Sequence, residues 1–139
     1  MAEPQQKLPA RAPDRESITL LAVSPYRDDH DRLKDMLRCD NWTVETAESC
    51  DEAVRAVQDS TPAVVACETD LPDGNWKDLF NLLTSLQNPP PVVVLSRHAD
   101  ETLWAEVLNW GGYDVLAKPL DPTEVSRVFG MASRYGRRG

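Results

Sequence analysis

The sequence predicts an α/β domain of the doubly wound kind, in which helices cover both faces of a parallel β-sheet. Short apolar runs that suit buried strands alternate along the chain with stretches whose apolar residues recur at helical spacing. Residues 92–95, VVVL, are apolar throughout, as in strands buried on both faces of a parallel sheet. Five strands alternating with five helices over about 115 residues imply parallel strands joined by helical crossovers.

The first half of the chain predicts three strands and two helices. The strands are expected at residues 18–23, 42–46 and 63–67. The first helix is expected at residues 28–39, where apolar residues recur at i, i+3 and i+4. The second helix begins after Ser49, which is expected to cap it, with Glu52 three residues later completing a capping box.

The second half predicts two strands and three helices. The strands are expected at residues 92–95 and 115–117. The apolar stripes of the helices are Leu79, Leu82, Leu83 and Leu86, then Leu103, Val107 and Leu108, then Val125, Val128, Phe129 and Ala132. Residues 89–91, three prolines, are expected to end the third helix, and residues 111–112, two glycines, the fourth. Asp121 is expected to cap the last helix.

The two ends of the chain fall outside this pattern. Residues 1–16 are rich in proline and poor in apolar side chains, and we interpret them as a disordered arm or linker. Residues 134–139 are interpreted as a basic tail. A single domain is therefore expected at residues 17–133.

The composition excludes several classes of function. The formal net charge of −8 disfavours binding to nucleic acid or to an anionic membrane surface. No apolar stretch is long enough to cross a bilayer, and a cytoplasmic location is expected. Cys39, Cys50 and Cys67 lack metal-type spacing and are interpreted as buried thiols. A zinc site is not expected, because neither His30 nor His98 has a second ligand at helical spacing.

In a doubly wound domain, the functional site lies at the carboxyl ends of the strands, where the strand order reverses. Four short segments follow the predicted strands at this edge: Ser24-Pro25, Glu68, Ser96-Arg97 and Lys118-Pro119. The sequence therefore predicts the functional site at these positions.

Three segments around these positions resemble the receiver domain of response regulators (the CheY-like family). Residues 111–120, GGYDVLAKPL, are similar to the family's Gly-Ala-x-Asp-(Tyr/Phe)-Leu-x-Lys-Pro-(Phe/Leu) segment. Residues 93–96, VVLS, resemble its strand that ends in Thr or Ser, and residues 62–74 resemble its phosphoacceptor strand and loop. The resemblance covers residues 18–133 and implies a flavodoxin-like sheet in the order 2-1-3-4-5 with five helices.

The resemblance also implies a chemistry, which is phosphoryl transfer to an aspartate at the end of the third strand. In the family, that aspartate and an acidic pair after the first strand hold a magnesium ion, and a Ser or Thr and a Lys contact the phosphoryl oxygens. The metal supplies most of the positive charge that lets a phosphoryl group approach a carboxylate. Ser96 and Lys118 match the hydroxyl and lysine positions of this set.

The remaining site positions depart from the family. Ser24 and Pro25 stand in place of the acidic pair, and Glu68 stands in place of the acceptor aspartate. Arg97 follows the hydroxyl, where the family usually has a small residue, and Val115 occupies the position of the aromatic switch. The sequence thus indicates a pseudo-receiver that lacks the phosphoacceptor and metal-binding acids.

We expect no cofactor and no magnesium at this site, since Mg²⁺ requires several oxygen ligands in a near-octahedral arrangement. Asp28 and Asp29 were weighed as replacement ligands and are assigned instead to the helix dipole. Glu68 is expected to pair with Lys118, with Arg97 in reach. It is interpreted either as part of a fixed scaffold or as a permanent stand-in for the phosphorylated aspartate.

The fourth helix, fifth strand and fifth helix form the usual partner face of receiver-like domains. Trp104, Trp110, Tyr113 and Val115 fall there, and Trp and Tyr are enriched at binding hot spots. We expect a protein partner or a homodimer through this face, while burial of the tryptophans in the core stays open.

The sequence therefore predicts a non-enzymatic, phosphorylation-independent interaction or regulatory module in signal transduction. The alternative is a phosphoaccepting receiver in a two-component phosphorelay that uses Glu68 or Asp70. A flavin-binding domain of the same architecture is disfavoured, because residues 24–27, SPYR, make a poor phosphate cradle.

Overall fold

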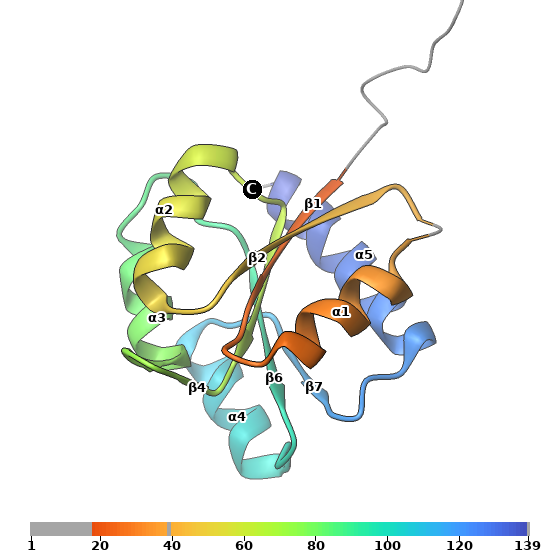
Figure 1. Ribbon diagram of the computed structural model, residues 1–139. Helices are drawn as coiled ribbons and strands as arrows, with labels where there is room; N and C mark the ends of the chain where they lie inside the picture. Colours follow the sequence, from red (N-terminus) through yellow and green to blue (C-terminus); the bar gives the residue numbers. More distant parts are fainter. Residues whose placement is uncertain (1–17, 39, 139) are drawn as a thin grey trace, which may run out of the picture.

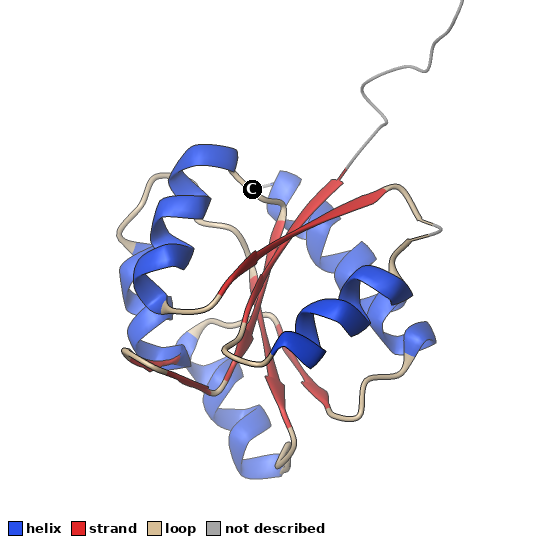
Figure 2. Cartoon of the chain, in the orientation of Figure 1, coloured by secondary structure: helices blue, strands red, loops and turns tan. Residues whose placement is uncertain are grey.

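The computed structural model describes residues 18–38 and 40–138, with side chains described through residue 135. The central sheet contains β1 (Ile18–Val23), β2 (Trp42–Ala47), β3 (Val64–Glu68), β6 (Val92–Ser96) and β7 (Asp114–Ala117). The helices are α1 (Arg27–Met36), α2 (Cys50–Ser60), α3 (Trp76–Thr84), α4 (Glu101–Trp110) and α5 (Pro122–Arg138). Figure 1 and Figure 2 show the sheet between two layers of helices.

The strand order confirms the predicted topology. All neighbours in the central sheet pair in parallel, in the order β2-β1-β3-β6-β7. This order is the predicted 2-1-3-4-5, because β4 (Asp70–Leu71) and β5 (Gly74–Asn75) form a separate two-stranded hairpin and only shift the numbering. The order reverses between β1 and β3, which places the switch point of the fold beside Ser24 and Glu68.

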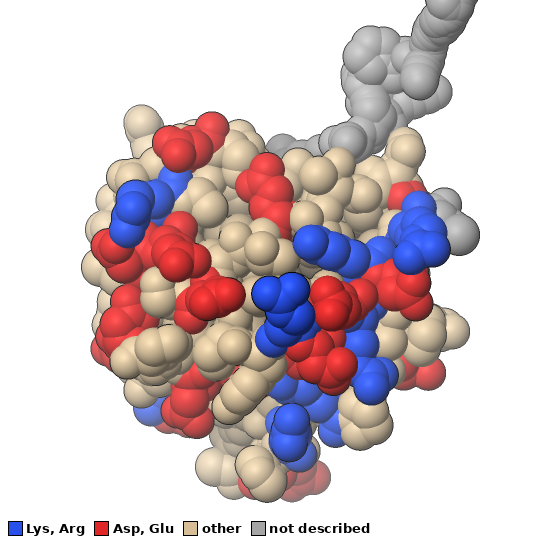
Figure 3. Space-filling model, in the orientation of Figure 1, with Lys and Arg blue, Asp and Glu red and all other residues tan. Residues whose placement is uncertain are grey.

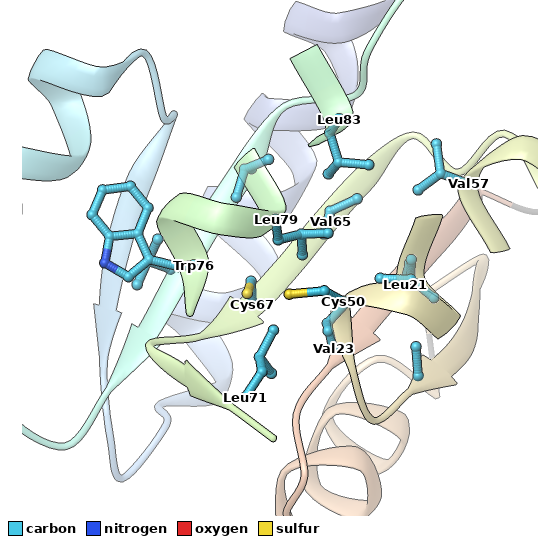
Figure 4. Packing of buried hydrophobic residues seen from close by; sticks show 14 of the residues in the cluster. Leu21, Val23, Cys50, Val57, Val65, Cys67, Leu71, Trp76, Leu79 and Leu83 are labelled. Carbon is cyan, nitrogen blue, oxygen red and sulfur yellow. The ribbon is translucent and has the colours of Figure 1, made fainter. Parts of the chain in front are cut away.

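Each face of the sheet carries its own hydrophobic core. Leu21 and Val65 point to the face covered by α2, α3 and α4, where they pack with Leu79 and Leu83 (Figure 4). Their neighbours in the strands point to the other face, where they meet α1 and α5 around the fully buried Phe129. Strands buried on both faces need apolar residues at every position, which explains why β3 and β6 read as continuous apolar runs.

Several element ends differ from the sequence prediction, and the first helix ends at Met36, three residues before the predicted end. The third helix ends at Thr84, five residues before Pro89, so the prolines do not terminate it directly. The last helix continues to Arg138, and Arg134 is therefore helical and not part of a tail. Gly111 ends α4 as predicted, with a φ of 104° that favours glycine.

The capping interactions were predicted in part. Ser49 caps α2 by accepting a hydrogen bond from the Glu52 amide, as expected. The Glu52 carboxylate does not complete the box, because it accepts from the Glu48 amide instead. Asp73, in the hairpin turn, provides additional caps by accepting from the Cys50 and Asp51 amides at 2.8 and 3.1 Å. The hairpin thus ties the loop after β3 to the start of α2.

Several expectations concern the chain ends, the cysteines and the surface. Cys50 and Cys67 are buried as expected, while residues 1–16 and Cys39 lie outside the described residues. No helix in the described part of the chain is long and apolar enough to cross a membrane. Figure 3 shows acidic and basic side chains interspersed on the face drawn, with acidic side chains prominent over α2.

Candidate functional site

The sheet brings the predicted site residues together at its carboxyl edge. Glu68 is the last residue of β3 and Ser96 the last residue of β6, while Ser24 directly follows β1. The Lys118 amide donates a 2.9 Å hydrogen bond to the Ser96 carbonyl, which fixes the chain beyond β7 against the end of β6. These residues therefore lie within one small region.

A buried ion triad occupies the centre of this region. The Lys118 Nζ lies 3.0 and 2.8 Å from the two carboxylate oxygens of Asp29, and it forms a second ion pair with Glu68 Oε1. The side chains of Lys118, Asp29 and Glu68 are only 8%, 5% and 9% exposed. We call these three residues the carboxyl-edge triad. The predicted pairing of Glu68 with Lys118 is confirmed.

The assignment of Asp29 to the helix dipole alone was wrong. Asp29 lies in the first turn of α1, but its side chain points into the site and binds Lys118. Asp28 behaves as a surface residue and pairs with Arg32 one turn further on, at 3.0 Å. Asp29 lies four residues before the buried Leu33 and so on the same helical face, which is the one indication in the sequence that it turns inward.

Ser24 holds the Asp29 carboxylate from the first strand. Its hydroxyl donates a 2.6 Å hydrogen bond to Asp29 Oδ2, and its oxygen accepts one from the Tyr26 amide at 3.0 Å. The Ser24 hydroxyl therefore orients a carboxylate that comes from α1.

Glu68 and Ser96 are each bound locally. Glu68 Oε2 accepts hydrogen bonds from the Thr69 amide and hydroxyl at 3.1 and 2.9 Å. The Ser96 hydroxyl oxygen accepts from the His98 amide at 3.0 Å. Among the described residues, no hydrogen bond joins Ser96 to Glu68, so the hydroxyl and the carboxylate do not act as one unit.

The charge state of Lys118 follows from this geometry. Burial by itself would lower the pKa of the ammonium group. Hydrogen bonds and charge from Asp29 and Glu68 outweigh that effect, and the pKa of Lys118 is raised above its ordinary value of 10.5. The lysine is therefore protonated throughout the physiological range and neutralises one of its two carboxylates.

Arg97 does not join the triad, contrary to the expectation that Glu68 lies within its reach. Within residues 18–38 and 40–138, Arg97 forms no ion pair with Glu68, and its guanidinium carbon lies 6.0 Å from the centre of the Tyr26 ring. The Lys118 Nζ lies 5.2 Å from the same ring. Tyr26, which sequence reasoning missed, thus covers the triad and contacts both cations through its π face.

The donor set does not fit magnesium. Both carboxylates that enter the site are bound to the Lys118 ammonium group, and Pro25 offers no side-chain oxygen. In the described part of the chain, no group of three or more His, Cys, Asp or Glu side chains could hold a metal ion. A cation entering here would have to displace a lysine that makes two buried ion pairs.

Three of the four predicted partner residues, Trp104, Tyr113 and Val115, lie on α4 or around the edge strand β7. Trp104 is 50% exposed, and Leu108, one turn further along α4, is also exposed. Val115 packs partly against the core under α4, and Tyr113 packs partly against the core under α5. The exposed apolar side chains of α5 on this side are Met131 and Tyr135, and the Tyr135 ring lies 5.5 Å from that of Tyr113.

We define the α4–β7–α5 face by the six residues Trp104, Leu108, Tyr113, Val115, Met131 and Tyr135. Trp110 lies elsewhere on α4, where its ring makes edge contacts with Trp76 and Phe80 of α3 at 5.8 and 6.3 Å. Lys77 contacts this group by lying 5.6 Å from the Trp110 ring and by pairing with Glu106. Trp110 therefore helps to join α3 to α4 and remains 38% exposed.

Comparison with known proteins identifies relatives of the chain. The family model of the response regulator receiver domain matches residues 27–129. An uncharacterized 14.6 kDa protein in the sodA1 3′ region of Leptolyngbya boryana is 27% identical over 116 residues, which are 80% of this chain and 86% of that protein. The photosynthetic apparatus regulatory protein RegA of Cereibacter sphaeroides is 28% identical over 97 residues, or 70% of this chain. The matched region spans only 53% of RegA, so this chain corresponds to part of that relative.

Solved structures agree on the fold. The signal receiver domain of an HD domain-containing protein from Pseudomonas fluorescens superposes with a TM-score of 0.79 at 20% identity, over 89% of this chain and all of that chain. The CheX-CheY-BeF3-Mg complex from Borrelia burgdorferi gives a TM-score of 0.73 at 18% identity, over 80% of this chain and 85% of that chain. The fold of these domains therefore extends over most of the described residues.

Proposed function

The chain belongs to the response regulator receiver family of two-component signalling, and we propose that within it the chain acts as a phosphorylation-independent interaction module. The observation that carries this proposal is the carboxyl-edge triad. Lys118, the lysine that matches the family's phosphoryl-contacting position, is bound by two buried carboxylates of its own chain. The positive charge that a phosphoryl group would need is already neutralised.

The charges of the site oppose phosphoryl transfer. The triad carries two negative charges and one positive charge, so a dianionic phosphoryl donor would meet a site with a net negative charge. The glutamate at position 68 also moves the carboxylate by one methylene relative to an aspartate, and a displacement of about 1 Å can cost about 10²-fold in rate.

Of the two interpretations of Glu68, the contacts favour a fixed scaffold. A stand-in for a phosphorylated aspartate would need to accept a hydrogen bond from the Ser96 hydroxyl, and among the described residues Glu68 accepts from Thr69 and not from Ser96. The aromatic switch position holds Val115, which has no ring to reorient. A conformational switch requires an element with two arrangements and a group that favours one of them. The contacts of Glu68 and the aliphatic side chain at position 115 support the fixed scaffold.

We further propose that the α4–β7–α5 face binds a protein partner or a second copy of this chain. This face combines an edge strand with exposed aromatic side chains, of which Trp104 and Tyr135 are the most exposed. Tryptophan and tyrosine dominate binding hot spots because they bury much area with few rotatable bonds. None of the six residues of the face belongs to the triad, so a partner can bind the face without a phosphoryl group at the triad.

Intact-mass spectrometry after incubation with acetyl phosphate tests the proposal directly. We expect no mass increase of one phosphoryl group with or without Mg²⁺, because Lys118 is bound by Asp29 and Glu68 and both carboxylates are engaged by it. A receiver domain with the complete acidic set serves as the positive control. A stable phosphoryl adduct that disappears in Glu68→Gln or in Asp70→Asn would establish the alternative, a phosphoaccepting receiver.

A further inference from the structure

A groove runs along the amino-terminal edge of the sheet, opposite the carboxyl-edge triad. It consists of two adjoining pockets of about 600 and 560 Å³, and residues 88–91 form a wall of both. Phe80, Val92 and Tyr135 line the first pocket, and Ile18 lines the second. None of the residues that line either pocket is charged, although 27% of the chain is.

We propose that residues 4–13 of this chain, PQQKLPARAP, dock in the groove of their own domain. The position of the chain supports this assignment. Ile18 is the first described residue and lines the second pocket of the groove. The preceding residues are therefore attached to the domain beside the groove. Figure 1 shows the start of β1 and the carboxyl end of α5 at the same end of the molecule. Any occupant from elsewhere would have to compete with a segment that is covalently attached beside the groove.

The chemistry of the arm matches that of the groove. Proline fixes its own φ, and residues 4, 9 and 13 are prolines, so this segment has less conformational entropy to lose on binding than an ordinary peptide. Proline-rich peptides dock in grooves lined by aromatic and other apolar side chains. Leu8, directly before Pro9, supplies a large apolar side chain for the pocket beside Phe80 and Tyr135. Tyr135 is the one residue that the groove shares with the α4–β7–α5 face, so the docked arm would cover that end of the face.

The arm is long enough to reach both pockets. Leu8 precedes Ile18 by ten positions, which corresponds to roughly 31 Å at about 3.1 Å per residue in an extended proline-type conformation. A folded chain of this size has a radius of gyration of about 14 Å, so this length spans an edge of the domain. Tethering also gives the arm an effective concentration on the order of millimolar, which allows weak contacts to hold it.

Amide NMR spectra of the full chain and of a variant that lacks residues 2–13 test the proposal. We expect the deletion to shift the amides of groove residues Thr84, Asn88, Val92 and Gly111, while the amides of Glu68 and Ser96 stay in place. A synthetic peptide of residues 2–13, added to the shortened chain, should restore the full-chain shifts and saturate. Identical groove shifts in the two chains would overturn the proposal.

A matched pair of substitutions tests the groove itself in the full chain. Thr84 and Ser85 are both exposed, and each hydroxyl bonds to a carbonyl three residues back, but only Thr84 lines the groove. Thr84→Arg should shift the arm amides of Leu8 and Ala10 toward those of the free peptide, and Ser85→Arg should leave them unchanged. Equal effects of the two substitutions would contradict docking in this groove.

A dilution series separates the arm of the same molecule from that of a second copy. Arm-dependent shifts that stay constant over a hundredfold dilution support docking within one chain. Shifts that disappear on dilution would show that the arm of another copy occupies the groove, and this would overturn the proposal as stated. The phosphodonor experiment is unaffected by either result, because the groove and the triad lie at opposite edges of the sheet.

Discussion

The carboxyl edge of the sheet and the α4–β7–α5 face differ in how completely their side chains are bound. At the carboxyl edge, three charged side chains are at least nine-tenths buried and bind one another. On the α4–β7–α5 face, large apolar side chains remain in contact with solvent, and Trp104 is half exposed. The charged groups of the carboxyl edge bind one another within the fold, whereas the exposed apolar groups of the α4–β7–α5 face can contact another molecule.

This difference indicates where binding specificity can reside. Charged groups that are paired and desolvated are costly to separate, so the triad resists ligands that would need one of its members. Exposed tryptophan and tyrosine side chains carry no such cost, and their burial by a partner is favourable. The carboxyl edge is thus closed by its own ion pairs, whereas the α4–β7–α5 face leaves large apolar side chains exposed.

Removing the triad's cation should produce the largest effect. Lys118→Met leaves Asp29 and Glu68 buried without a counter-charge, and we expect the free energy of unfolding to fall by about 3–5 kcal/mol. Urea denaturation measures this change. Arg38→Met is the control, since Arg38 pairs with Asp35 on the exposed surface and should change stability little. Similar losses in the two variants would show that the triad is no more important than a surface pair.

The raised pKa of Lys118 predicts how stability depends on pH. A group whose pKa is higher in the folded than in the unfolded state stabilises the fold fully below its unfolded pKa, about 10.4. That contribution is lost as the pH rises through the folded pKa. We therefore expect the free energy of unfolding to decline above about pH 10, measured by urea denaturation at each pH.

Lys118→Met provides the comparison, since this decline should be smaller in a chain without the titrating lysine. Other lysines and tyrosines also titrate in this range, and the difference between the two chains removes their contribution. Parallel pH profiles would contradict the assignment of the raised pKa to the triad.

Substitutions of the two tryptophans of α4 should have different effects, one on stability and the other on association. Trp110→Ala removes ring contacts with Trp76 and Phe80, and we expect a loss of about 1–2 kcal/mol in the free energy of unfolding. Trp104→Ala should change stability by less than about 0.5 kcal/mol, because this side chain is half exposed. Sedimentation velocity should show weaker self-association for Trp104→Ala, and unchanged association would remove Trp104 from the interaction surface.

Much of the fold was predictable because its strands and helices have clear periodic patterns. The register of a parallel sheet then brings together the residues that follow each strand, which is why Glu68 and Lys118 could be paired from the sequence. Helix boundaries near Thr84 and Arg138 were less certain, since local capping and tertiary packing decide where a helix ends.

The sequence could not supply the second acid of the site. Asp29 is one of two adjacent aspartates in the first turn of α1, where acids favour the helix dipole in any case. Its place on the helical face of Leu33 separates it from Asp28, but whether that face brings the carboxylate to Lys118 depends on how α1 packs against the sheet. Tyr26 was missed for a similar reason, because its contact with Lys118 crosses from one loop to another.

Glu68→Gln tests the central claim most directly, because it removes one charge from the triad and touches nothing on the α4–β7–α5 face. We expect the free energy of unfolding to fall by about 1–3 kcal/mol, as for the loss of a buried hydrogen-bonded charge. The amide NMR shifts of Trp104, Leu108, Tyr113 and Val115 should stay unchanged, because among the described residues the Glu68 side chain binds Thr69 and Lys118 and no residue of that face. Shifts at these four amides, together with unchanged stability, would show that Glu68 holds the face in an active-like state and would contradict the account.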